Sequence, residues 1–592
     1  MRIWLILPVS LILLCLFSCS SDERSEADRT FEALAERFLD RHLAACPEEA
    51  TALGDHRFDS QLTDFSAAGI SARTAMYRAY RDSLRAIRVE TLSPQHMVDY
   101  DIMQRALASR LFELEELREW QWNPLLYSVG EELYMLIARD YAPPEQRMRS
   151  LAGRLRAIPK LLEQARRNLN APPAMHTQTA MLQNEGTIAL LEETLPPMLR
   201  ELPDALRDSL RAARTMAVDA LRAYGYWLKR DLISRARGDF RLGADLYERK
   251  FAIRLNTRQP PSVLLDEAER RLDLVTAAMY RTALELHAAH LAEMEVPDDT
   301  AALIRRALDH LAGQRPNDST VVETARASLR RAEDFVRAER LVPLPDEPLE
   351  IIVMPEFQRG VAVAYCDAPG PLEKNGETFF AIAPTPAGWT DDRRTSFYRE
   401  YNDHMLLNLI VHEAMPGHFV QLAAANRADA PTLLRSVFPS GVFAEGWATY
   451  AEELMTERGF GGPELRLQQL KMYLRLLINA IIDQRIHMHG MSRSDAVRLM
   501  MDRGFQEEGE AAVKWSRACL TSVQLSTYFF GNLRINDIRA RAERQDGEDF
   551  DLRAFHDALL SFGTIDPGYI PVLMKLPDSV PGRPLAEGLS RR

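Results

Sequence analysis

The chain has 592 residues, of which 46% are hydrophobic, 27% charged and 8% aromatic, and its formal net charge is −12. This length and composition suffice for a large buried core, and no low-complexity linker or repeat divides the sequence. The acidic balance argues against nucleic acid as a partner, because phosphate binding requires concentrated lysine and arginine.

The amino terminus has the layout of a secretory signal. Residues 3–17 form an apolar run that is too short and wrongly flanked for a membrane-spanning helix. Leu16-Phe17-Ser18-Cys19 fits the bacterial lipoprotein pattern, although Phe17 is bulkier than usual at its position. We predict that Cys19 becomes the lipidated first residue of the mature protein. An ordinary signal peptide that contains cysteines is the alternative.

The predicted boundaries follow from this signal. We expect a lipoprotein signal peptide over residues 1–18, a flexible acidic tether over residues 19–30, and a single large domain over residues 31–580. Ser20, not aspartate, follows the cysteine, so nothing argues for retention in the inner membrane. The expected location is the outer membrane of a two-membrane bacterium, with the protein facing the periplasm or the cell surface.

Three cysteines remain after the signal, at Cys46, Cys366 and Cys519. Their wide spacing does not make a disulfide framework, and none lies near a histidine as a zinc ribbon requires. Each is expected to be a small core residue, or else one pair bridges in an oxidising compartment.

Helical periodicity dominates the chain. Apolar residues recur at helical spacing over residues 72–88, 206–235 and 263–290, which predicts a mainly helical fold. Two segments, residues 349–363 and 377–384, are instead short, rich in branched or aromatic residues and bounded by turn residues. These segments predict strands of a small sheet.

The sequence from Val411 to His418, followed by Glu445, predicts a zinc site. His412, His418 and Glu445 supply two imidazoles and one carboxylate, and such a set leaves a fourth position at zinc for water. Glu413, beside the first histidine, is the predicted general base.

The two histidines are six residues apart, whereas H-E-x-x-H places them four apart on one helical face. Six residues of a straight helix turn through roughly 600°, which leaves the side chains about 120° apart and about 9 Å apart along the axis. The Pro416 ring opposes the carbonyl of His412, and Gly417 tolerates unusual conformations. We predict that the helix breaks there, so that His418 returns to the face of His412.

The surroundings of the motif predict burial. Residues 406–411 form an apolar run into His412, and buried ionisable groups in such a setting require a partner. Thr449 and Glu452 follow Glu445 on the same helical stripe. Glu452 is therefore predicted to hydrogen-bond a metal ligand without itself binding the metal.

Two segments match the hallmarks of a bacterial family. Residues 412–421 read HExxPGHxxQ and residues 445–452 read EGWAxYxE. In both segments the chain resembles the bacterial domain-of-unknown-function family 885, which is grouped with the zincin-type metallopeptidases. The resemblance implies a large, gluzincin-like helical fold with two lobes around a cleft and a small sheet beside the metal site.

Zincins commonly have an edge strand along the cleft that pairs with the extended substrate. By this resemblance Phe379, Phe380 and Ala381 are the predicted substrate strand. The alternative is a strand that only covers the core.

Zincins often add a tyrosine or histidine from a later helix to stabilise the oxyanion. Two candidates fill this role. His487, four residues after Asp483, resembles the family's Asp-x-x-x-His element, in which the aspartate orients the imidazole; a helix-surface ion pair is the alternative. Tyr528 is the second candidate, with a core tyrosine as the alternative.

These residues predict a hydrolase that holds one zinc per chain and cleaves peptide bonds of short, extended peptides in the cell envelope. Glu413 is expected to accept a proton from the attacking water and deliver it to the leaving nitrogen. Two alternatives stay open. One is a non-catalytic peptide-binding lipoprotein with the same cleft, and the other is a metal-dependent ester or phosphoester hydrolase.

Overall fold

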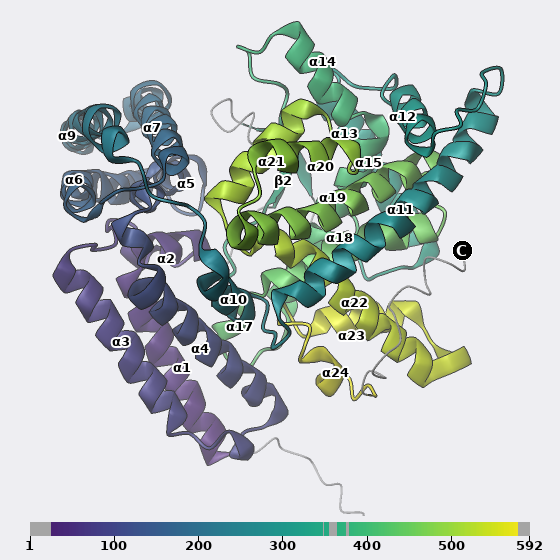
Figure 1. Cartoon of the computed structure of the whole chain (residues 1–592). Coiled ribbons are helices and arrows are strands. Elements are labelled where there is room, and N and C mark those ends of the chain that lie inside the picture. The colour runs from purple at the N-terminus through teal and green to yellow at the C-terminus, as the bar shows by residue number, and fades with distance from the viewer. Residues whose placement is uncertain (1–24, 347–348, 355–363, 374–377, 578–592) are drawn as a thin grey trace, which may run out of the picture.

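A computed structural model describes residues 25–346, 349–354, 364–373 and 378–577 of the chain (Figure 1). The predicted signal peptide and the predicted lipidation site at Cys19 lie outside these described residues. Among the helices described, none is long and apolar enough to cross a membrane.

The chain is mainly helical, as predicted, and its first helix, α1 (Glu26–Ala45), begins earlier than expected. The Ser25 hydroxyl accepts from the backbone N–H of Asp28, and the Asp28 carboxylate accepts from the backbone N–H of Ser25. This capping box fixes the helix start. The prediction of a flexible tether as far as residue 30 is therefore wrong from residue 25 onward, because the acidic residues that resemble a tether form the first helical turn.

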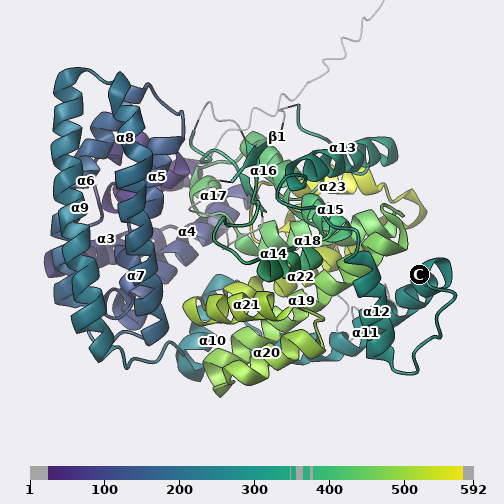
Figure 2. The same cartoon turned by 90° about the horizontal axis from the view of Figure 1, so that it is seen from above.

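The amino-terminal helices lie together on one side of the molecule (Figures 1 and 2). The first group is α1, α2 (Pro47–Leu53), α3 (Ala67–Arg85) and α4 (Pro94–Phe112). The second group is α5 (Gly130–Ala138), α6 (Pro144–Asn168), α7 (Ala174–Ala189), α8 (Leu195–Met198) and α9 (Asp204–Trp227). This second group encloses a hydrophobic cluster of its own.

The rest of the chain is built around α18, α19 and α22, which contact one another (Figure 1). The helices before the sheet are α10 (Gly243–Arg254), α11 (Pro261–His290), α12 (Thr300–Leu311) and α13 (Val321–Glu339). Those after it are α14 (Asp391–Glu400), α15 (Asp403–Glu413), α16 (His418–Arg427), α17 (Leu434–Val437), α18 (Gly441–Glu457), α19 (Gly462–His489), α20 (Arg493–Asp502), α21 (Glu508–Leu520), α22 (Gln524–Asp546), α23 (Leu552–Ser561) and α24 (Ile570–Leu573).

A small sheet lies beside α15. Its strands are β1 (Glu350–Val353), β2 (Ala364–Asp367) and β3 (Phe379–Ile382), in the order β1-β3-β2. β3 runs parallel to β1 and antiparallel to β2, and all four of its residues are in register with both neighbours. Residues 355–363 and 377 of the predicted strand segments lie outside the described part of the chain.

The prediction that Phe379, Phe380 and Ala381 form an edge strand is wrong. They belong to the central strand, whose two edges are already paired. Phe380 and Ala381 are also fully buried. Strand propensity locates a strand but does not give its place in a sheet, and within the described residues it is β2 that lies at the edge next to α15.

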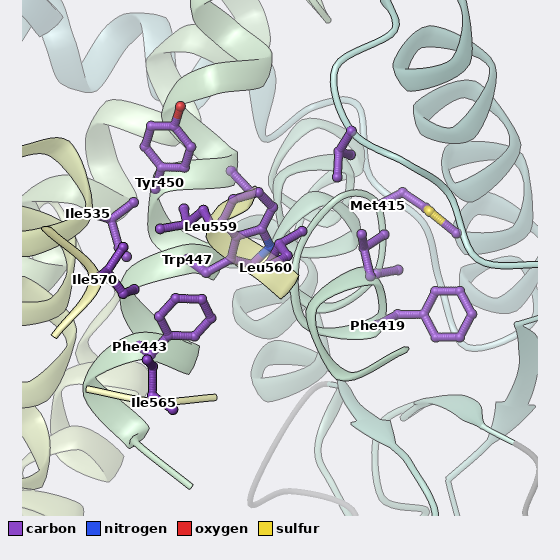
Figure 3. Close-up of a cluster of buried hydrophobic side chains, with 14 of the residues drawn as sticks. Met415, Phe419, Phe443, Trp447, Tyr450, Ile535, Leu559, Leu560, Ile565 and Ile570 are labelled. Atoms are coloured by element: carbon purple, nitrogen blue, oxygen red, sulfur yellow. The ribbon is translucent and has the colours of Figure 1, made fainter. Parts of the chain in front are cut away.

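Helix α18 carries both core side chains and candidate site side chains. Phe443, Trp447 and Tyr450 recur at helical spacing and lie in the largest hydrophobic cluster (Figure 3). Figure 3 also shows Met415 and Phe419 in this cluster, from the segment that carries the histidine motif. The core thus packs the two motif segments against each other.

Helices α18 and α22 approach closely at two glycines. A Cβ atom added to Gly446 would lie 2.6 Å from the carbonyl carbon of Gly531. A Cβ atom added to Gly531 would lie 2.2 Å from the carbonyl oxygen of Val442. Both contacts are with backbone, which cannot rotate away as a side chain can.

We expect Gly531→Ala to lower the free energy of unfolding by about 1–3 kcal/mol, because the methyl group would push α18 and α22 apart. Gly186→Ala, in the exposed face of α7 with nothing within 4 Å of its Cβ position, is the matched control. It should raise the free energy by up to about 1 kcal/mol through lower unfolded-state entropy. Denaturant unfolding measures both, and destabilisation of equal size in both variants would contradict the close-approach argument.

Candidate metal centre

The histidine motif is built on a break between two helices. As its spacing predicts, α15 ends at Glu413 and α16 begins at His418, with a cis peptide bond between Met415 and Pro416. A Cβ atom on Gly417 would lie 1.7 Å from the carbonyl oxygen of His412, so only glycine fits. The return of the chain brings the two histidine rings to a centroid distance of 4.9 Å, at 88° to each other.

Trp447 of the second motif holds this break in place. Its indole Nε1 donates to the carbonyl oxygens of Pro416 and Gly417, at 2.8 and 3.3 Å. The side chain is fully buried. The carbonyl groups exposed by the helix break are thereby satisfied inside the core, as buried backbone groups require.

His412, His418 and Glu445, which we call the metal centre, point at one another. One ligand atom from each lies within 4.8 Å of the others. The Nε2 atoms of His412 and His418 are 3.7 and 3.6 Å from Oε2 of Glu445. Ligands held about 2.0–2.2 Å from a tetrahedral zinc lie roughly 3.4 Å apart, so the arrangement is close to that geometry.

The donor atoms fit a cation. Oε2 of Glu445 is buried and has no hydrogen-bond partner among the described residues. A buried carboxylate oxygen without a partner is costly. A cation between this oxygen and the two imidazoles would remove that cost.

Glu452 lies behind His412, as its helical spacing from Glu445 predicts. The Nδ1 atom of His412 is 2.7 Å from Oε1 of Glu452, and the Asn408 amide donates to Oε2 at 2.6 Å. A carboxylate only accepts, so Nδ1 of His412 carries a proton, and Nε2 is the ring nitrogen that a metal at the centre would bind.

Opposite charges stabilise the ionised forms of these groups. Burial opposes protonation of His412, but Glu445, Glu452 and Glu413 outweigh it and hold its pKa well above the usual range. Burial likewise opposes ionisation of Glu445, but His412 and His418 outweigh it and lower its pKa. The anionic surroundings of the imidazoles favour a bound cation.

Glu413 faces a cavity of roughly 290 Å³ whose lining also includes His412 and Tyr528. Oε2 of Glu413 accepts from the backbone N–H of Cys366, on edge strand β2, at 3.3 Å. The sheet therefore orients the predicted base beside the metal centre.

Tyr528 lies in the same cavity, where sequence reasoning placed one of its two oxyanion donors. Its hydroxyl oxygen accepts from Arg517 at 2.8 Å and from the Gln524 amide at 3.2 Å. Burial, with the charge of Glu445 next, raises the pKa of Tyr528 to about 12, so the hydroxyl keeps its proton near neutral pH.

The prediction that His487 is catalytic is wrong. Its Nε2 atom is 2.8 Å from the carbonyl oxygen of Thr521, and its ring is stacked on Tyr247 inside a hydrophobic cluster. His487 is not among the cavity-lining residues that the structure describes. The i, i+4 spacing from Asp483 occurs equally in a structural pair.

Asp483 caps a helix instead of orienting a catalytic imidazole. Its carboxylate accepts from the backbone N–H groups of Val523 and Ser526, each at 3.0 Å, and from the Ser526 hydroxyl at 2.7 Å. These bonds fix the start of α22. Asp483 thus positions the helix that carries Tyr528.

Sequence reasoning missed Asn408 and Trp447 as parts of the site. Asn408 was detectable, because it is a polar residue within an apolar run and lies one helical turn before His412. The role of Trp447 depends on contact between segments 30 residues apart, which no local pattern shows.

A second group of ligand-type residues, His42, Cys46 and Glu49, lies at the junction of α1 and α2. Glu49 already pairs with Arg110 at 2.6 Å, and Nδ1 of His42 is 3.0 Å from the Tyr77 hydroxyl. A cation would have to displace the guanidinium. Cys46, like Cys366 and Cys519, is a free thiol, so the alternative of one bridged pair does not hold in this structure.

Fold and site together define a mainly helical protein with a half-buried His/His/Glu set at the edge of a cavity. Residues 47–572 match the family described as "Bacterial protein of unknown function (DUF885)", and the chain belongs to this family. No curated protein matches the chain.

Two solved structures share the fold. A "putative lipoprotein of unknown function" from Shewanella oneidensis is 32% identical, with a TM-score of 0.80, over 92% of this chain and 99% of that one. A "putative lipoprotein" from Colwellia psychrerythraea is 17% identical, with a TM-score of 0.77, over 93% of this chain and 98% of that one.

We expect elemental analysis of the purified protein to find about one zinc per chain, and none in His418→Ala, which removes one of three protein ligands. Gly417→Ala should also lose the zinc, because the added methyl group would force His412 and His418 apart. His404→Ala is the control, since that imidazole lies 3.2 Å from the side-chain oxygen of Gln314 and is no part of the centre. Full zinc content in His418→Ala would contradict this ligand set.

Proposed function

We propose that the protein is a zinc-dependent hydrolase that cleaves amide bonds in short peptides. The observation that carries the proposal is the buried, unpartnered Oε2 of Glu445 between two imidazole nitrogens, with Glu413 beside it in a cavity. The likeness of the two motifs to those of zincin-type metallopeptidases also supports a zinc-dependent hydrolase.

Zinc bound at this centre would polarise the substrate carbonyl and lower the pKa of the attacking water. Glu413, held by the Cys366 N–H, accepts the proton of that water and transfers it to the leaving nitrogen. The Tyr528 hydroxyl, which keeps its proton, donates to the developing oxyanion. Glu413 would thus act on the proton of the attacking water, and Tyr528 would act on the oxyanion.

The geometry favours short, extended substrates. A cavity of roughly 290 Å³ lies at the small end of ligand pockets, which span about 300–1,000 Å³. β2, not β3, is the edge strand beside α15 and Glu413, with which an extended peptide can align. A folded protein has no extended segment free to enter, so peptides of a few residues are the proposed substrates.

We expect Glu413→Gln to slow peptide cleavage by about 10²–10⁴-fold, because proton transfer is lost while the ligands stay. Mass spectrometry of a peptide mixture incubated with zinc-loaded protein measures this. Glu453→Gln is the matched control, because this half-buried carboxylate on α18 accepts from the Asn532 amide at 2.6 Å and does not belong to the metal centre. Cleavage by Glu413→Gln at the parent rate would show that Glu413 is not the base, and a zinc-loaded parent that cleaves nothing would refute the proposal.

We also propose that the protein is anchored to the cell envelope through a lipid on Cys19. Its lipobox-like sequence carries the proposal, and the descriptions of both structural neighbours as lipoproteins support it. The full-length chain should partition into detergent after phase separation, and Cys19→Ser should move it to the aqueous phase. Detergent partitioning of Cys19→Ser equal to that of the parent would rule out this anchor.

A further inference from the structure

Lys514, on α21, is a buried residue that lines the cavity beside the metal centre. The cavity lining includes Lys514 together with His412 and Glu413, and the Lys514 residue is only 8% exposed. Among the described residues its ammonium has no hydrogen-bond or ion-pair partner. The mechanism above gives it no task.

The other buried cations of this region are all paired. Glu400 accepts from both Lys471 and Arg475 at 2.9 Å, and Arg475 also lies 3.4 Å from Glu510. Burying an ammonium without an anion costs several kcal/mol, which explains why the paired arrangement is the rule. Lys514 is the exception to this pairing, and it lines the cavity, where a ligand can reach it.

The electrostatics of Lys514 agree with a missing anion. Burial, followed by the charge of Arg475, lowers the pKa of Lys514 to about 7. Glu510 and Glu445 act in the opposite direction but do not restore the usual value. An anion bound in contact would stabilise the protonated form.

Arg517 lies one turn further along the same face of α21. Its guanidinium donates to two neutral groups, the Tyr528 hydroxyl at 2.8 Å and the Gln524 side-chain oxygen at 3.2 Å. No carboxylate among the described residues pairs with it. The buried Lys514 and the exposed Arg517 therefore place two basic side chains without a paired carboxylate next to the proposed oxyanion donor.

We propose that Lys514 and Arg517 bind a carboxylate of the substrate peptide while its amide bond lies at the metal centre. This inference rests on the proposed function and names the substrate class within it. Charge-assisted hydrogen bonds from an ammonium and a guanidinium are the strong contacts for a carboxylate. One extended residue spans about 3.3–3.6 Å, so in a cavity of this size the carboxylate lies within a few residues of the cleaved bond.

Two parts of a peptide can supply this group: the C-terminal carboxylate and an aspartate or glutamate side chain. Binding to the zinc-loaded Glu413→Gln variant, measured by calorimetry, separates them without turnover. One pair of peptides differs in a free or amidated C-terminus, and a second pair differs in glutamate or glutamine near that end. We expect loss of the recognised carboxylate to weaken binding by about 10- to 100-fold in one of the pairs.

Lys514→Met, added to Glu413→Gln, should remove most of that difference by weakening only the peptide that carries the carboxylate. Lys229→Met is the control, since Lys229 is exposed and pairs with Glu185 away from the cavity. Equal binding within both pairs, or an unchanged difference in Lys514→Met, would overturn the inference. If the zinc-loaded parent cleaves peptides but the binding measurements give either of these results, only this inference fails. If the zinc-loaded parent cleaves no peptide, the proposed function fails and this inference fails with it.

Thermal unfolding distinguishes a binding role from a structural one. Because Lys514 has no partner, Lys514→Met should unfold at the parent temperature or above it. Lys471, which pairs with Glu400, is the comparison. Lys471→Met should unfold at a clearly lower temperature than the parent, because Glu400 then keeps only one of its two cations. A fall in Lys514→Met as large as that in Lys471→Met would assign Lys514 to the structure and overturn the inference.

Discussion

The contact between α18 and α22 at Gly446 and Gly531 sets the geometry of the whole site. Glu445 immediately precedes the first glycine, and Tyr528 lies one turn before the second, so one backbone contact positions a candidate metal ligand and the candidate oxyanion donor. Trp447 follows on the same turn and holds the break between the histidines. Three consecutive residues thus have three roles. Glu445 is the candidate ligand, Gly446 allows α22 to approach α18, and Trp447 holds the histidine segment by hydrogen bonds.

What the sequence predicted well depends on local geometry. The helix break at Pro416 and Gly417 follows from the covalent limits of those two residues, and the position of Glu452 follows from helical periodicity relative to Glu445. The mainly helical fold and the presence of β1 and β3 rest on patterns of the same kind. In each case the determining interactions lie within about two helical turns.

What could not be predicted depends on partners far away in the chain. Whether β3 is central or at an edge is decided by strands whose pairing the sequence of β3 does not encode. His487 lies four residues after Asp483, a spacing that suits catalysis. Its ring is nevertheless buried against residues of α10 and α21, which the local sequence does not indicate. Lys514 gives no signal in the sequence, because its significance is that no carboxylate among the described residues pairs with it, whereas the nearby Lys471 and Arg475 share Glu400.

The largest hydrophobic cluster joins α1 and α4 to the helices that carry the two motifs. Asp99 of α4 also forms a buried pair with Arg435 of α17 at 2.6 Å, and Phe38 of α1 is stacked on Phe438. The half of the chain that carries the two motifs therefore shares its core with the amino-terminal half, and separating the two would expose that core. Its folding and its stability therefore belong to the whole chain, and the family match likewise spans both halves, from residue 47 to residue 572.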